Sequence, residues 1–171
     1  MEADSKADWR TWRAGEGASR IDAEGPPSGF SKARSTQEIS GRPRLMAVAY
    51  VDTSCLVAIA FGERGALATE RRMEEFDELV ASNFLEAELR SAFKTENVEF
   101  EASTLSKISW LIPDRPLTDE IARVLAGGYL RGADCWHLAA ALYLSTDPSA
   151  LTFLTLDEAQ RKVANALGFP V

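Results

Sequence analysis

The sequence predicts an α/β fold with a mainly parallel sheet in residues 46–171, on three observations. Short apolar runs of the strand type alternate with segments of helical periodicity, which is the pattern of βαβ units. Residues 133–144 form a helical segment that is apolar almost all round, as expected for a helix at the centre of a domain. A unit of about 125 residues is also long enough to bury a hydrophobic core without disulfides or metals as staples.

The first elements are predicted from a compact apolar run and the segments that follow it. Residues 48–51 form this run, which is typical of a buried strand. Ser54 is expected to cap the helix that comes next. A charged helix is expected over 66–78, and a short strand over 79–81.

The middle of the domain is predicted to contain two further helices and a strand. Residues 83–94 are expected to be helical, with Asn83 and Glu86 as a near match to a capping box. Residues 101–107 are expected to be helical as well. A strand is expected over 109–112, where the proline that follows ends it.

The last elements are predicted from helix-start signals. A helix is expected over 118–125, because two acids lie in its first turn, where the helix dipole favours them. The apolar helix over 133–144 is followed by a strand over 151–154. Thr155 is expected to cap the last helix, and Glu158 to complete its capping box.

Residues 1–45 differ in composition from the rest of the chain. They are rich in glycine and proline, show no hydrophobic periodicity, and carry a net charge of +1. We predict that they form a disordered or loosely attached leader, or that the start codon is miscalled, because Met46 directly precedes the first strand. The alternative is a functional arm that carries Trp9, Arg10 and the pair Trp12-Arg13.

Composition excludes several classes of protein. No run of about 18 apolar residues occurs and no signal peptide is apparent, so we expect no membrane span. Cys55 and Cys135 form no CxxC unit, which indicates free thiols in a reducing cytosol and predicts a cytoplasmic protein. The single histidine excludes His-rich metal sites. The net charge of −7 argues against binding nucleic acid by simple electrostatic attraction.

Four acids stand at positions that ordinary surface acids do not occupy. Asp52 ends the first strand, and Asp157 follows the last one. Asp134 begins the most hydrophobic helix, and Glu88 lies among the apolar positions of its own helix. Since ligands bind at the carboxyl ends of strands in open α/β sheets, we expect these acids to converge there. Converging carboxylates need a cation, and oxygen ligands of this kind suit Mg²⁺ or Mn²⁺.

Each of these acids also has a purely structural interpretation. Asp52 and Asp134 are candidates for helix caps, and Asp157 lies where the helix dipole alone favours an acid. Glu88 would be a surface acid if the helix were rotated, whereas Glu86 matches the capping position better and is assigned a structural role.

Four short motifs carry a family resemblance. The first is Tyr50-Val51-Asp52-Thr53-Ser54-Cys55-Leu56-Val57, and the second is Ala81-Ser82 followed by Ala87-Glu88-Leu89-Arg90-Ser91-Ala92. The third is Leu130-Arg131-Gly132-Ala133-Asp134-Cys135-Trp136-His137-Leu138-Ala139-Ala140-Ala141-Leu142. The fourth is Phe153-Leu154-Thr155-Leu156-Asp157, with Leu167-Gly168-Phe169 after it. In this order and spacing, residues 47–171 resemble a PIN-domain ribonuclease, specifically a VapC-type toxin of a toxin–antitoxin pair.

The resemblance implies a three-layer α/β/α sandwich in which Asp52, Glu88, Asp134 and Asp157 line one metal pocket. Hydroxyl groups at positions such as Ser54 and Thr155 support that pocket in the family. Two features depart from the family pattern: the leader, and the end of the chain at Val171 where the family usually continues into a last strand.

We therefore predict a Mg²⁺- or Mn²⁺-dependent endoribonuclease that cleaves single-stranded RNA. Asp52, Glu88, Asp134 and Asp157 are its predicted catalytic and metal-binding residues, and Arg131 is a candidate to grip a phosphate, although a solvated loop arginine fits it equally. The resemblance also implies a cognate VapB-type antitoxin and a homodimer.

Three alternatives remain at this stage. The first is a non-catalytic PIN module that binds RNA or a protein partner, and the second is a PIN nuclease of RNA processing without an antitoxin. An aspartyl phosphatase is disfavoured, because Ser54 stands where such enzymes carry a second aspartate. His137 is either a contact of Asp134 or of a phosphate, or a buried core residue, and the latter is favoured.

Overall fold

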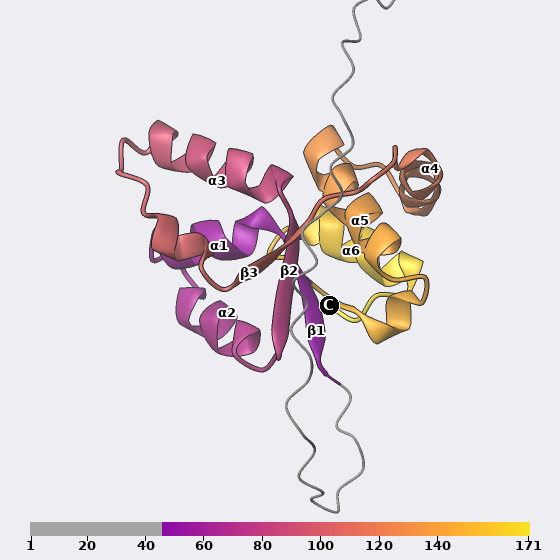
Figure 1. Ribbon diagram of the computed structural model, residues 1–171, viewed down its shortest axis with the longest axis horizontal. Helices are drawn as coiled ribbons and strands as arrows, with labels where there is room; N and C mark the ends of the chain where they lie inside the picture. The colour runs from indigo at the N-terminus through magenta and orange to yellow at the C-terminus, as the bar shows by residue number, and fades with distance from the viewer. Residues whose placement is uncertain (1–45) are drawn as a thin grey trace, which may run out of the picture. The chain divides into compact units, whose positions relative to one another are not determined.

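A computed structural model of the chain describes residues 46–171, and these contain a four-stranded sheet. The strands are β1 (Val48–Val51), β2 (Glu78–Ser82), β3 (Ile108–Leu111) and β4 (Thr152–Leu154). They lie in the order β3-β2-β1-β4, and every neighbouring pair is parallel (Figure 1). The expectations for the leader, residues 1–45, lie outside the described residues.

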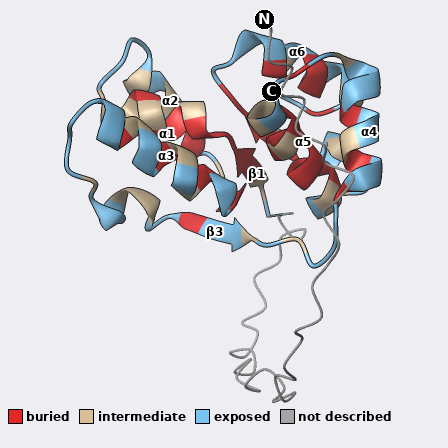
Figure 2. Ribbon diagram, turned by 90° about the horizontal axis from the view of Figure 1, so that it is seen from above, coloured by how far each residue is buried: buried red, intermediate tan, exposed pale blue. Residues whose placement is uncertain are grey.

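Helices cover both faces of this sheet (Figures 1 and 2). One layer holds α1 (Thr53–Ala60), α2 (Ala66–Met73) and α3 (Phe84–Thr95). The other holds α4 (Thr118–Gly127), α5 (Gly132–Leu144) and α6 (Glu158–Leu167). Two short 3₁₀ helices, η2 (Ala102–Leu105) and η3 (Pro148–Ala150), lie in the connections. The prediction of a three-layer α/β/α sandwich with a parallel sheet is confirmed.

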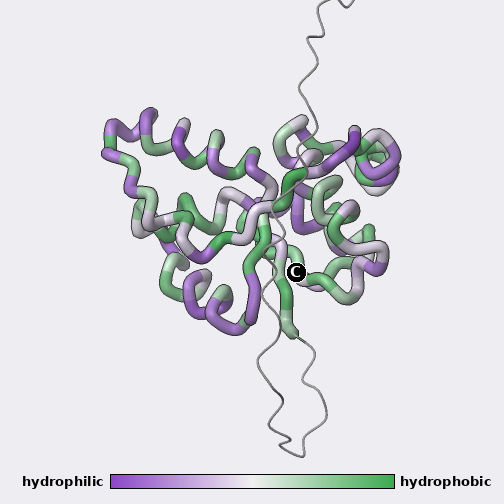
Figure 3. The backbone as a smooth tube through the Cα atoms, in the orientation of Figure 1, coloured by the Kyte–Doolittle hydropathy of each residue, from purple (hydrophilic) through white to green (hydrophobic). Residues whose placement is uncertain are grey.

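The two layers are separated by the alternation of side chains along β1. Tyr50 packs into the core formed with α4, α5 and α6, whereas Ala49 and Val51 pack into the core formed with α1, α2 and α3. A strand that is buried on both faces must be apolar throughout, and β1 and β2 lie among the hydrophobic parts of the chain (Figure 3).

The helix α5 is the centre of its layer, as its apolar sequence predicts. Leu138, Ala139, Ala140 and Ala141 are fully buried against the sheet and the neighbouring helices. The helix α4 shares this core, because its Val124 is buried in the same cluster as Leu138 of α5. Within residues 46–171, no helix is long and apolar enough to cross a membrane.

The strand order creates a switch point beside β1. The chain moves outward from β1 to β2 and β3, and then returns to place β4 on the opposite side of β1. The backbone N–H of Asp52 donates to the carbonyl of Leu154 at 2.9 Å, so the carboxyl ends of β1 and β4 are tied together. Such a switch point is where ligands bind in open α/β sheets.

Two helices differ from the sequence-based expectations. The helix expected over 66–78 ends at Met73, because the N–H groups of Asp77 and Glu78 donate to the carbonyl of Ala47 and draw this segment into the sheet. The helix expected over 101–107 is a single 3₁₀ turn. The first error arises because pairing with a distant strand overrides local periodicity.

The helix caps expected at Ser54 and Thr155 are wrong, whereas the cap role considered for Asp52 is confirmed. Asp52 caps α1 by accepting from Ser54 N–H, and Asp157 caps α6 by accepting from Gln160 N–H. Thr155, which was expected at the second cap, instead donates to Asp52.

The expected capping box of α3 does not form either. Asn83 makes no side-chain cap bond, and Glu86 pairs with Arg90 one helical turn later. The role of Glu86 is still structural, as expected, but it acts on the helix surface rather than at the helix start.

Leu138 offers a direct test of the core. Leu138→Ala is expected to lower the free energy of unfolding by about 2–5 kcal/mol, because it leaves a cavity under the sheet. Leu125→Ala is the matched control: Leu125 lies on the adjacent α4 and is 48% exposed, so its loss is expected to cost about 1 kcal/mol or less. Urea denaturation measures both, and equal losses would contradict the assigned core.

Candidate functional site

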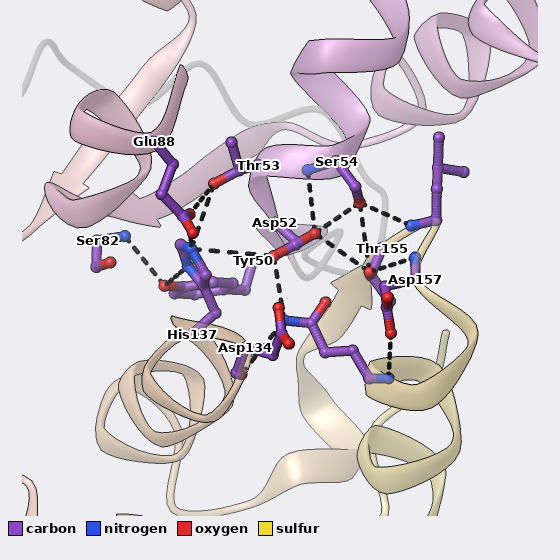
Figure 4. Close-up of polar contacts among 12 residues, drawn as sticks. Tyr50, Asp52, Thr53, Ser54, Ser82, Glu88, Asp134, His137, Thr155 and Asp157 are labelled. Carbon is purple, nitrogen blue, oxygen red and sulfur yellow. Dashed lines mark hydrogen bonds and ion pairs between the residues drawn. The ribbon is translucent and has the colours of Figure 1, made fainter. Parts of the chain in front are cut away.

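The four acids singled out in the sequence come together at the carboxyl edge of the sheet (Figure 4). Asp52 follows β1, Asp157 follows β4, Glu88 projects from α3, and Asp134 lies in the first turn of α5. Burial raises the pKa of Asp134, and the negative charges of Asp157, Asp52 and Glu88 raise it further. The four carboxylates are therefore close enough to repel one another.

Asp52 forms the buried floor of this site. Its Oδ2 accepts hydrogen bonds from Ser54 N–H at 3.1 Å, from Ser54 Oγ at 2.6 Å and from Thr155 Oγ1 at 3.3 Å. Its Oδ1 accepts from Nε2 of Gln160 at 3.1 Å. Ser54 and Thr155, predicted to support the pocket, thus both contact this carboxylate. The capping and site interpretations of Asp52 are compatible, since one carboxylate meets both requirements.

Glu88 is held on the opposite side of the site. Its Oε2 accepts from Thr53 Oγ1 at 2.5 Å and lies 2.7 Å from Nε2 of His137. Burial alone would raise the pKa of Glu88, but the hydrogen bonds from His137 and Thr53 outweigh burial and lower it. Glu88 therefore faces the site rather than bulk solvent, with its side chain 28% exposed.

Asp134 and Asp157 lie nearer the rim. Asp157 is exposed, and its Oδ1 accepts the capping bond from Gln160 N–H at 2.7 Å, so the structural interpretation of this acid holds beside the functional one. Asp134 is half-buried and does not cap α5, because Arg131 occupies the cap position. Solvent exposure therefore increases across the site, from the buried Asp52 to the exposed Asp157.

The acidic cluster reaches the exposed surface at Asp157, and none of its four acids lines a cavity found in residues 46–171. The cavity of about 720 Å³ lies elsewhere, where Met73, Glu78 and Ile108 line it near the starts of β2 and β3, and none of the four acids lines it. An open edge with a buried floor suits a polymer better than a small enclosed ligand.

Gln160 is a site residue that the sequence analysis missed. It is fully buried, and its Nε2 donates to Asp52 and also to the backbone carbonyl of Asp134 at 3.3 Å. Both contacts are acceptors, which fixes the orientation of the amide and leaves Oε1 buried without a hydrogen-bond partner. The available signal was a polar residue in the buried stripe of α6, in line with Val163 and Ala164.

The acidic cluster fits a divalent cation in the chemistry of its donors. Crowded carboxylates and the unpartnered Oε1 of Gln160 are oxygen donors of the type that Mg²⁺ and Mn²⁺ prefer. Within residues 46–171, however, no three Asp, Glu, His or Cys side chains already surround a common metal position.

The remaining candidates are placed as follows. His137 is buried, as favoured, but it contacts Glu88 rather than Asp134. Arg131 is exposed at the start of α5, and its phosphate-binding role stays a prediction. Cys55 and Cys135 are free and buried, as predicted. Burial, with the nearby charge of Asp52, raises the pKa of Cys55 to about 12, so this thiol is not an active nucleophile.

Comparison with known proteins gives one finding. A family model described as "PIN domain" matches residues 49–166, which is more than half of the chain and contains all four acids. No curated protein and no solved structure matches the chain significantly.

The crowding of the acids predicts an unusual effect of Asp134→Asn. Because the pKa of Asp134 is raised in the folded chain, its ionised form opposes folding at neutral pH. The substitution is expected to raise the Tm of the metal-free protein at about pH 7. This gain should shrink as the pH falls through the pKa of Asp134, where the wild-type carboxyl loses its charge. Thermal unfolding in EDTA at several pH values measures this.

Asp119→Asn is the matched control for that substitution. Asp119 also lies in the first turn of a helix, but it is exposed and is not among the charges that act on Asp134, so its loss removes a favourable dipole interaction. This variant is expected to leave the Tm unchanged or to lower it slightly. A lower Tm for Asp134→Asn at neutral pH would contradict the repulsion inferred here.

Proposed function

Because the chain belongs to the PIN-domain family, we propose that it is an endoribonuclease that cleaves single-stranded RNA with Mg²⁺ or Mn²⁺ and acts as a VapC-type toxin. PIN domains are generally metal-dependent nucleases, so a nuclease is the coarse expectation for any member. The observation that carries the proposal is the convergence of Asp52, Glu88, Asp134 and Asp157 at the switch point of the sheet. The proposed nuclease domain is 46–171, which includes the matched residues 49–166.

The proposed mechanism assigns a role to each side chain. Asp52, Glu88 and Asp134 would hold the cation, and Asp157 would complete the site or act through a water molecule. When bound, Mg²⁺ or Mn²⁺ supplies Lewis acidity, which makes water a stronger acid and offsets negative charge on the attacked phosphate. Nothing in this reaction requires a serine or cysteine nucleophile.

The neighbouring groups restrict how these carboxylates move. Ser54, Thr155 and Gln160 occupy both oxygens of Asp52, so this side chain is held in place before substrate arrives. Preorganised groups cost no rearrangement at the moment of reaction. Arg131 is proposed to contact a phosphate of the substrate at the exposed start of α5.

Two features support single-stranded RNA as the substrate. The acidic crevice is open at its rim, where Asp157 is exposed, so a flexible strand can reach the buried floor. Phe84 is 39% exposed at the start of α3, and its ring lies 6.0 Å from the ring of His137. An exposed aromatic ring beside the acids offers a surface on which an unpaired base can stack.

The proposed partners are a cognate VapB-type antitoxin and a second copy of the chain, with the cytoplasm as the proposed location. The resemblance of the four motifs to VapC-type toxins supports this proposal. An acidic crevice also attracts a basic tail, which is the chemistry expected of an inhibitor that must block it. The competing functions are a non-catalytic PIN module and a PIN nuclease of RNA processing without an antitoxin.

Glu88→Gln and Glu86→Gln form a matched pair that tests the catalytic proposal. Both residues lie on α3 and both substitutions remove one charge, but only Glu88 faces the other acids. Glu88→Gln and Asp52→Asn are expected to lower the cleavage rate of a labelled single-stranded RNA by about a hundredfold or more, since even supporting residues at metal sites contribute tenfold or more.

Glu86→Gln is expected to cleave at the wild-type rate, and EDTA should abolish cleavage in every variant. Equal activity of wild type and Asp52→Asn that persists in EDTA would reject the mechanism. Binding of RNA without cleavage by the wild type would favour the non-catalytic module.

The toxin role is tested by expression in bacteria. Wild type is expected to arrest growth, Asp52→Asn is expected to be harmless, and co-expression of a small protein encoded immediately upstream should restore growth. Cleavage of RNA in vitro without any growth defect would instead favour the RNA-processing nuclease.

A further inference from the structure

A buried chain of polar groups leads from β2 to Glu88 through Tyr50 and His137 (Figure 4). The backbone N–H of Ser82 donates to Oη of Tyr50 at 3.1 Å. Oη of Tyr50 lies 3.0 Å from Nδ1 of His137, and Nε2 of His137 lies 2.7 Å from Oε2 of Glu88. Tyr50 is fully buried and His137 is 1% exposed, so water does not compete for these bonds.

The donors and acceptors along this chain determine its direction. Nε2 of His137 lies 2.7 Å from an oxygen of the Glu88 carboxylate, which can only accept, so Nε2 carries the ring hydrogen and Nδ1 accepts the hydroxyl hydrogen of Tyr50. Burial raises the pKa of Tyr50, which keeps that hydrogen on the oxygen. An imidazole that accepts at Nδ1 carries its hydrogen at Nε2, where it faces the carboxylate of Glu88.

Packing holds both rings in the required orientation. The ring of Tyr50 stacks on that of Phe153, with centroids 5.4 Å apart and an interplanar angle of 5°. Phe84 packs against the other ring, that of His137. The residues that follow His137 on α5 are buried leucine and alanine, so an apolar side chain would suit this position at less cost than a polar one. A core role alone does not account for the histidine.

We infer that Tyr50 and His137 are positioning residues that hold Glu88 in one orientation at the acidic crevice, with His137 locked as its Nε2–H tautomer. The same Nε2 lies 3.9 Å from Oδ1 of Asp52, so this N–H stands between two of the four carboxylates. It offsets their repulsion and presents Glu88 toward the place where a cation would bind. The role toward the cation rests on the proposed function, whereas the tautomer is a property of the chain itself.

The composition of the chain makes the tautomer directly observable. His137 is the only histidine, so a full-length protein labelled with nitrogen-15 histidine and made without a histidine tag gives ring signals from this residue alone. The metal-free wild type is expected to show one tautomer, with hydrogen on Nε2. A ring with hydrogen on Nδ1, or with hydrogen on both nitrogens, at neutral pH would overturn the inference whether or not the protein is a nuclease.

Two tyrosine variants test how the tautomer is held. Tyr50→Phe removes the donor to Nδ1, while the carboxylate of Glu88 still accepts from Nε2, so the variant is expected to shift the signal of Nδ1 and to keep the hydrogen on Nε2. Tyr143→Phe is the matched control, because its hydroxyl also donates to a side chain, Asp114 at 2.7 Å, but that pair is not in the acidic cluster. This control is expected to leave the ring signals unchanged. An unchanged Nδ1 signal in Tyr50→Phe would overturn the role of Tyr50.

Binding of Mg²⁺ alone, measured by calorimetry, tests the role toward the cation. Tyr50→Phe is expected to weaken binding roughly tenfold or more, the usual effect of losing a group that orients a metal ligand, while Tyr143→Phe binds as wild type does. Wild-type affinity in Tyr50→Phe would overturn the positioning role and leave the proposed nuclease standing. A wild type that neither binds Mg²⁺ nor cleaves RNA would overturn both the positioning role and the proposed nuclease. The tautomer of His137 would then still show whether the hydrogen bonds between Tyr50, His137 and Glu88 form.

Two histidine variants separate positioning from packing. His137→Gln keeps one donor and one acceptor, whereas His137→Leu keeps only the bulk. The positioning role predicts that the glutamine variant retains more Mg²⁺ affinity than the leucine variant, with circular dichroism to show that both are folded. Equal or better Mg²⁺ binding by the leucine variant would mean that His137 only fills space, and would overturn the inference.

Discussion

Repulsion among four carboxylates at one edge of the sheet is the constraint around which the site is arranged. Asp52 and Glu88 have the least access to water, and each of them receives two or more hydrogen bonds from fixed donors. These donors spread the negative charge without neutralising it. The pKa of Asp134 is raised by burial first, and then by the charges of Asp157, Asp52 and Glu88. A site that is costly when empty and acidic throughout is well suited to draw in a cation.

The topology of the sheet explains why the four carboxylates are brought together despite their repulsion. A parallel sheet sends the carboxyl ends of all its strands to one edge, and the crossover that places β4 beside β1 brings two acid-bearing turns into contact there. The helices that follow start at the same edge, so their N-terminal dipoles lower the energy of nearby negative charges. Asp52 and Asp157 both benefit from these dipoles, since each caps a helix and also belongs to the acidic cluster. The same two carboxylates therefore stabilise helices and form part of the acidic site.

The layers of the fold and the identity of the four acids could be predicted, because both depend on local patterns. Strand-end acids and apolar periodicity are visible in the printed residues. The exact helix starts could not be predicted, since the choice between Thr155 and Asp157 as a cap depends on a hydroxyl that turns to the distant Asp52. Gln160 was missed for the same reason, because its hydrogen-bond partners lie in other elements. A single polar residue among the buried positions of α6 looks like a minor break in the apolar periodicity and does not indicate a site by itself.

Net charge is consequently a poor guide to the partner of this domain, and the position of each charge is a better one. The net charge of −8 in residues 46–171 indicates repulsion of a nucleic acid when it is treated as a single quantity. Most of these acids lie on solvated helix surfaces, where salt screens them within about one Debye length. The four at the switch point are different, because they lie close to one another and all except Asp157 are partly or fully shielded from water. A polyanion that approaches this edge meets a centre that favours divalent cations, so the local charge after cation binding, rather than the charge of the whole chain, decides whether a phosphate is attracted.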